Sequence, residues 1–242
     1  MGTIALLTLE TLFFSKKTIF VGFLSAAVLG MAVVARLMPG FSRGGGVLAP
    51  PEFFPILFSA VVLRFVVVVV MLFYGTALIG EEVDGKTLTY LFLRPVSKAS
   101  IMAGKFLALA WIGAILVLPA VLAGYLILCL GRQPLAREAG ELAQMLGVTF
   151  VALLAYGSFF ALLGAWLRHC LLAGLCYAFG WEGILAYLPG TTRKLTIAYY
   201  VQAMLGSGGR GALEPMVTLL LAAAVFFLIA ALVLREKEYI MG

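Results

Sequence analysis

The chain has 242 residues, of which 64% are apolar and only 12% are charged, and its mean hydropathy is +1.13. A soluble domain carries about a quarter charged residues, so this composition excludes a water-soluble fold and makes lipid the solvent for most of the surface. The net charge of +6 forms no basic stripe with interleaved aromatic residues, which argues against nucleic acid as a partner and favours anionic lipid headgroups.

Residues 1–16 predict a helix that lies in the membrane interface. Ala5, Leu9 and Leu12 fall on one helical face, and the first positive charges, Lys16 and Lys17, come only after this apolar stretch. A secretory signal peptide begins with a basic region, so we do not expect this segment to be cleaved. A plain extension of the first membrane span is the alternative.

Six segments are apolar enough to be transmembrane helices, which need about 20 mostly apolar residues. They are residues 18–38, 53–79, 101–130, 143–167, 170–188 and 216–234. The sequence therefore predicts an all-α, polytopic membrane protein that forms one domain over residues 1–242. Small residues within the spans, including Gly157 and Gly164, are expected to let helices approach closely. The link at residues 189–215 is predicted to be an interfacial or re-entrant segment on the outer side.

An even number of spans places both ends of the chain on the same side of the membrane. With the termini inside, slightly more lysine and arginine residues fall in the cytoplasmic loops than outside. We therefore expect a multi-pass protein of the cell inner (plasma) membrane with both termini in the cytoplasm.

A polar segment at residues 80–98 separates the second and third spans. Gly80 to Thr87 satisfies the phosphate-loop pattern G-x-x-x-x-G-K-[ST], but such a loop needs a preceding strand and a following α/β domain. The preceding apolar run is too long for a strand. The carboxylates of Glu81, Glu82 and Asp84 would also repel a triphosphate. We interpret the match as accidental.

The same segment predicts a short amphipathic helix on the cytoplasmic side. Leu88, Leu91, Phe92 and Pro95 recur at the spacing of one helical face. The acidic start and the basic end, with Arg94, suit the helix dipole. Such a helix could dock onto a soluble partner or simply lie on the lipid headgroups, and the spacing alone leaves both interpretations open.

The segment also resembles the signature of type-2 ABC transporter permeases. The resemblance is carried by the acidic run Glu81-Glu82-Val83-Asp84-Gly85, by Thr87-Leu88, by Arg94-Pro95-Val96-Ser97-Lys98 and by Gly104-Lys105. Six spans and an amphipathic N-terminal helix are compatible with that family over nearly the whole chain.

The resemblance implies that this segment is a coupling helix, which docks into a separate ATP-binding cassette subunit. The residues it assigns to docking are Glu81, Glu82, Asp84, Gly85, Thr87, Leu88, Leu91, Phe92, Arg94 and Pro95. It also implies that ATP and Mg²⁺ bind to the partner, that this chain binds no cofactor and is not itself an enzyme, and that two permease chains pair as a homodimer or a heterodimer.

Two ionisable residues lie within the predicted spans, Arg64 in the second and Glu182 in the fifth. Charges at membrane depth are costly and usually face a protein interior or water. Both are expected in the outer half of the bilayer, and we predict that they pair. A structural ion pair, a snorkelling Arg64 and a substrate contact are all compatible with this placement. No set of residues has the spacing of a metal site or of a nucleophile and its base.

The polar segment, the span count and the resemblance thus lead to the hypothesis of a permease subunit of an ABC transporter, and the resemblance implies export as the direction. The rival hypothesis is a self-contained secondary transporter or channel. That class would show more paired intramembrane charges, broken helices in both halves or an internal repeat. The nearly charge-free spans fit an amphipathic cargo, but they also fit a charged cargo handled by partner proteins.

Overall fold

The computed structural model describes residues 16–37, 50–84, 98–129, 135–167, 169–187, 191–206 and 211–241. Every secondary-structure element in these ranges is helical, which confirms the predicted all-α class. The predicted interfacial helix lies outside the described residues except for Lys16, where the first described helix begins.

The described part of the chain consists of helices in succession. In chain order they are α2 (Lys16–Leu37), α3 (Pro50–Leu57), the π-helical η2 (Phe58–Val66), α4 (Val67–Asp84), α6 (Lys98–Cys129), α7 (Leu135–Trp166), α8 (Cys170–Leu175), the π-helical η3 (Cys176–Trp181), α9 (Glu182–Tyr187), the 3₁₀-helical η4 (Thr191–Leu195), α10 (Ile197–Gly206) and α11 (Leu213–Met241). The elements α3, η2 and α4 form one continuous helical run.

Five helices in the described part of the chain are long and apolar enough to cross a membrane. They cover Thr18–Leu37, Phe54–Leu78, Met102–Leu128, Ala139–Trp166 and Leu213–Val233, within a few residues of five of the predicted spans. The remaining predicted span corresponds to the apolar stretch Cys170–Leu185. At 1.5 Å per residue this stretch is about 24 Å long, shorter than the ~30 Å hydrocarbon core. A sixth crossing therefore stays a prediction.

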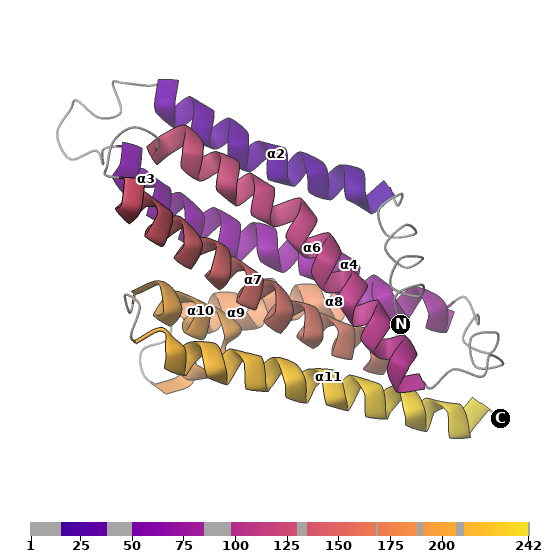
Figure 1. Cartoon of the computed structure of the whole chain (residues 1–242). Helices are drawn as coiled ribbons and strands as arrows, with labels where there is room; N and C mark the ends of the chain where they lie inside the picture. Colours follow the sequence, from indigo (N-terminus) through magenta and orange to yellow (C-terminus); the bar gives the residue numbers. More distant parts are fainter. Residues whose placement is uncertain are drawn as a thin grey trace.

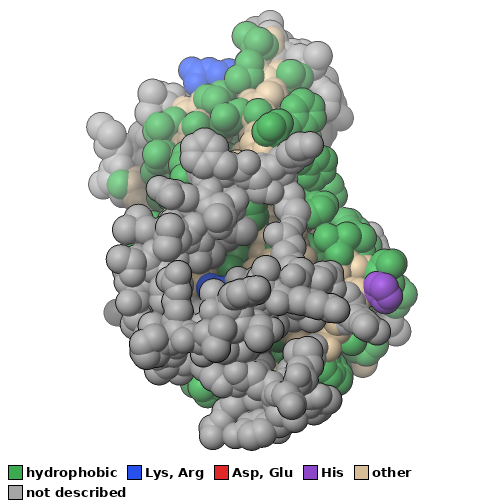
Figure 2. All heavy atoms as spheres, turned by 90° about the vertical axis from the view of Figure 1, so that its right-hand side faces the viewer, with side chains coloured by type: hydrophobic (Ala, Val, Ile, Leu, Met, Phe, Trp, Pro, Cys, Tyr) green, Lys and Arg blue, Asp and Glu red, His purple; other side chains and the backbone are tan. Residues whose placement is uncertain are grey.

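The long helices lie side by side and their ends gather into two groups. Figure 1 places the start of α2, the end of α4, the start of α6 and the end of α11 at one end of the bundle. The elements α9 and α10 and the start of α11 lie at the other end. Figure 2 looks onto the first end and shows apolar side chains on the flanks of the bundle, as expected for a surface whose solvent is lipid.

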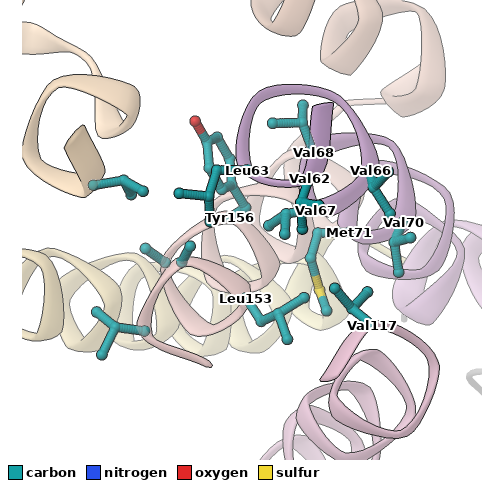
Figure 3. Close-up of a cluster of buried hydrophobic side chains, with 14 of the residues drawn as sticks. Val62, Leu63, Val66, Val67, Val68, Val70, Met71, Val117, Leu153 and Tyr156 are labelled. Carbon is teal, nitrogen blue, oxygen red and sulfur yellow. The ribbon is translucent and has the colours of Figure 1, made fainter. Parts of the chain in front are cut away.

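The core is centred on η2 and α4. Val66, Val67 and Met71 are almost completely buried, and they lie against Val117 of α6 and Leu153 of α7 (Figure 3). Helices α2 and α11, by contrast, expose large apolar side chains along much of their length. The helical run α3–η2–α4 is thus the buried centre of the bundle, and α2 and α11 are peripheral.

Helices α4 and α7 approach each other through glycines. A Cβ added at Gly75 of α4 would lie 2.9 Å from the Cβ of Phe160, and one added at Gly164 of α7 would lie 2.9 Å from the carbonyl oxygen of Thr76. Real Cβ atoms do not come this close to other atoms, so side chains larger than hydrogen are excluded unless the helices separate. The predicted role of Gly164 is confirmed, and Gly75 joins it at this α4–α7 seam.

Candidate functional site

The predicted coupling segment lies between α4 and α6. Helix α4 continues to Asp84, so the backbone of Glu81, Glu82 and Asp84 forms its last turn, and α6 begins at Lys98. The other predicted docking residues lie outside the described residues; they are Gly85, Thr87, Leu88, Leu91, Phe92, Arg94 and Pro95. Their docking role therefore stays a prediction.

The two helices that flank this segment are joined just inside it. Lys105 of α6 is 6% exposed, and its Nζ donates a hydrogen bond to the carbonyl oxygen of Leu78 in α4 at 3.5 Å. The neighbouring Gly104 is also buried. A buried ammonium group needs such an acceptor. The contact therefore connects the first turns of α6 to the last turns of α4.

A polar cavity lies among the elements at the other end of the bundle. It has a volume of about 330 Å³. Its polar lining consists of Arg64 from η2, Glu182 from α9, Arg193 and Thr196 from the η4 region, and Tyr199 and Gln202 from α10. The structure thus brings the two predicted intramembrane charges, Arg64 and Glu182, to one cavity. A direct ion pair between them stays a prediction.

The carboxylate of Glu182 is buried and receives hydrogen bonds from two elements. The Tyr156 hydroxyl of α7 lies 2.9 Å from both carboxylate oxygens and donates to them. The backbone N–H of Ala198 donates to Oε1 at 3.1 Å. Figure 3 shows the Tyr156 oxygen directed away from the valine-rich cluster. These donors offset part of the cost of burying a charge, since charge-assisted hydrogen bonds are stronger than neutral ones.

The same contacts cap the N-terminus of α10. Thr196 precedes this helix, and its Oγ1 accepts a hydrogen bond from the N–H of Tyr199 at 3.3 Å. Its hydroxyl also donates to the carbonyl oxygen of Arg193 at 2.8 Å. Together with the bond from Ala198 to Glu182, two of the unpaired first-turn amides are satisfied. The negative charge of Glu182 also suits the positive end of the helix dipole. Helix α10 is thereby fixed to α9 and η4.

Arg64 is held by a residue that the sequence analysis did not single out. When the Gln202 amide is oriented to satisfy its surroundings, its oxygen accepts hydrogen bonds from Nε of Arg64 at 2.8 Å and from Nη2 at 2.9 Å. Arg64 is exposed. A signal for Gln202 was present in the sequence, because it is a strongly polar residue within the otherwise apolar α10. Tyr156 gave no comparable signal.

Two π-helical segments lie at or next to the cavity. Arg64 lies in η2, and Glu182 directly follows η3. The two segments meet at Phe65 and Phe179, whose rings pack edge to face with their centroids 6.3 Å apart. π-helical turns are rare and occur frequently at functional sites, because the extra residue changes the direction of neighbouring side chains. The cavity supplies guanidinium and hydroxyl groups, which makes it suited to binding a polar ligand.

Comparison with known protein families gives a match over most of the chain. The model of a family described as "ABC-2 family transporter protein" matches residues 10–181, which is 172 of the 242 residues. No curated protein matches the chain. The match includes α2, the run α3–η2–α4, α6 and α7, with the segment 80–98 between them. The chain therefore belongs to the ABC-2 transporter family and is a multi-pass type-2 ABC transporter permease.

Proposed function

We propose that this permease is the membrane subunit of an ATP-driven exporter. A separate ATP-binding cassette subunit binds ATP and Mg²⁺ and hydrolyses ATP, and this chain converts the resulting motion into movement of a substrate across the membrane. The proposal rests above all on the family match, which spans the segment 80–98 and both helices that flank it.

The packing around the segment supports the transmission of motion. Lys105 ties α6 to the end of α4, and the glycine seam joins α4 closely to α7. Close-packed interiors move as rigid bodies rather than deforming gradually. A displacement of residues 80–98 by a docked partner would therefore move α4, α6 and α7 together.

The continuous run α3–η2–α4 extends this path through the bundle. From Asp84, next to the proposed docking helix, to Arg64 at the cavity the run has 20 residue steps, or about 30 Å. A rigid helix of this length carries a tilt at one end to the other. The cavity at Arg64 is thus mechanically connected to the docking segment in this proposal.

The functional unit in this proposal contains two permease chains, as a homodimer or a heterodimer, with two cassette subunits. Residues 80–98 and both termini face the cytoplasm, and residues 189–215 lie on the outer side of the plasma membrane. Large exposed apolar side chains on α2 and α11, such as Phe23 and Leu221, are available for contact with lipid or with the second permease chain.

Co-expression with a candidate ATP-binding cassette subunit tests the proposal. We expect the two proteins to purify as a complex whose ATPase rate exceeds that of the cassette subunit alone. The double substitution Leu91→Asp and Phe92→Asp places charges on the docking face, so it should abolish the stimulation while the membrane part stays folded.

The matched control is Leu195→Asp, which changes an exposed leucine at the opposite end of the bundle. This variant should keep the stimulated ATPase rate. If the complex and its activity survive the double substitution, the docking assignment is wrong. Transport by this chain in vesicles without ATP or a cassette subunit would favour the secondary-transporter class instead.

A further inference from the structure

The polar cavity has no role that follows from family membership alone. Arg64 and Tyr156 lie within the matched range, but the match ends at residue 181. Glu182, Arg193 and Gln202, which complete the cavity, come after that point. The family match therefore covers only part of the cavity.

The charges in the cavity favour an anion. Two guanidinium groups, from Arg64 and Arg193, line it together with the single carboxylate of Glu182. That carboxylate already receives hydrogen bonds from Tyr156 and from the first turn of α10. The net formal charge of these lining groups is therefore positive, and the N-terminus of α10 adds positive potential at the same place.

Arg64 has donors left for a ligand. A guanidinium group carries five N–H donors in a planar fork, and two of them bond to Gln202. The fork matches the geometry of phosphate and carboxylate oxygens. Arg64 is also exposed within a helix that is apolar enough to span the membrane, where a charge facing lipid would be costly. A bound anion would offset that cost.

An exposed aromatic pair lies next to Arg64 along the chain. Phe65 follows Arg64 directly in the chain and is 42% exposed, and its ring packs against that of Phe179, which is 54% exposed. An acyl chain could lie against this aromatic pair while its headgroup enters the cavity. The volume of about 330 Å³ is at the lower end for small-molecule pockets, which fits a headgroup rather than a whole lipid.

We propose that the cavity binds the phosphate headgroup of an anionic amphiphile, with Arg64 and Arg193 as its cationic partners and the Phe65–Phe179 pair beside the acyl chain. The proposal does not depend on the coupling to ATP, because binding requires only this chain.

The test is a binding titration of the purified full chain in an uncharged maltoside detergent. The probes are dihexanoyl phosphatidic acid, dihexanoylglycerol with the same acyl chains but no phosphate, and inorganic phosphate. Phosphatidic acid should bind saturably and at least about tenfold more tightly than either other probe, since each of them lacks one of the two recognised parts. Equal affinity for inorganic phosphate and phosphatidic acid would overturn the amphiphile assignment, and so would equal affinity for dihexanoylglycerol.

Matched variants locate the site. Arg64→Gln and Arg193→Gln should each weaken phosphatidic acid binding by about tenfold, the usual effect of losing a charged hydrogen-bond partner. Lys194→Gln also removes a positive charge, from the 3₁₀ helix that contains Arg193. Lys194 does not line the cavity, so the affinity of this variant for phosphatidic acid should stay unchanged. Unchanged melting temperatures show that the variants are folded. The proposal is refuted if both arginine variants bind as tightly as the unmodified chain, or if Lys194→Gln weakens binding equally.

Discussion

The α4–α7 seam and the polar cavity use the same continuous helical run in opposite ways. At the seam, Gly75 and Gly164 remove side chains so that backbones meet among buried apolar residues. At the cavity, η2 presents an exposed guanidinium group beside a buried carboxylate. Two positions on one run, about 17 Å apart from Arg64 to Gly75, therefore differ in character: one allows close packing, and the other exposes the charged group that we propose binds a ligand.

The contrast follows from the way lipid treats apolar and charged groups. Lipid provides no hydrophobic driving force between apolar helices, so the seam depends on close packing. Charged groups cannot be left to lipid, so the cavity depends on hydrogen bonds among Glu182, Tyr156 and α10. Substitutions at the seam should therefore change stability by disturbing the packing of the helices. Substitutions at the cavity should change it by removing hydrogen-bond donors.

The largest loss of stability is expected from Gly164→Ala, at the seam. The new methyl group would lie 2.9 Å from a backbone carbonyl oxygen of α4, which cannot rotate away. Overpacking of this kind should lower the free energy of unfolding by about 1–3 kcal/mol and reduce the melting temperature in detergent. Gly147→Ala, in the same helix, has nothing within 4 Å of its new methyl group and should stabilise by about 0.5–1 kcal/mol through helix propensity. If both variants raise the melting temperature alike, the seam is not close-packed.

A smaller effect is expected from Tyr156→Phe. This change removes the hydroxyl that donates to both oxygens of Glu182 but leaves the ring in place. Hydrogen bonds between membrane helices contribute about 0.6 kcal/mol on average, up to about 1.7 kcal/mol, and a buried charged acceptor places this one at the upper end. The melting temperature should fall modestly. Tyr200→Phe in α10 is the control, because the interaction found for Tyr200 is a ring contact with Tyr199 rather than a hydrogen bond. Equal melting temperatures for the two variants would show that the hydroxyl of Tyr156 contributes nothing.

The helical class and most spans could be predicted because lipid imposes a length and an apolar composition on each crossing helix. Five spans agree with the predicted ranges within a few residues. The stretch Cys170–Leu185 is not among these five spans because it is short, and its π-helical turn reduces its reach further. Such turns leave no simple periodic signature in the sequence, since they depend on how neighbouring helices pack.

Only those site residues whose chemistry is unusual for a membrane span could be predicted from the sequence. Arg64 and Glu182 are conspicuous because ionisable residues are rare in spans. Their hydrogen-bond partners were not predicted. Tyr156 resembles the other aromatic residues of the spans, and Gln202 stood out only as a polar residue in an apolar stretch, because its contact with Arg64 exists only in the folded chain. Gly75 was missed for the same reason, because its importance depends on Phe160 in another helix.

The proposed transmission of motion runs from residues 80–98 to the cavity along the rigid run α3–η2–α4. It is tested most directly in the complex with the cassette subunit, with Gln202→Cys as a reporter and Cys129, Cys170 and Cys176 replaced by alanine. The rate of labelling by a water-soluble maleimide is measured without nucleotide and with ATP trapped by vanadate. We expect the rate to change severalfold on trapping, and we expect this change to disappear when Leu91 and Phe92 are replaced by aspartate. Identical rates in the two nucleotide states would contradict the account.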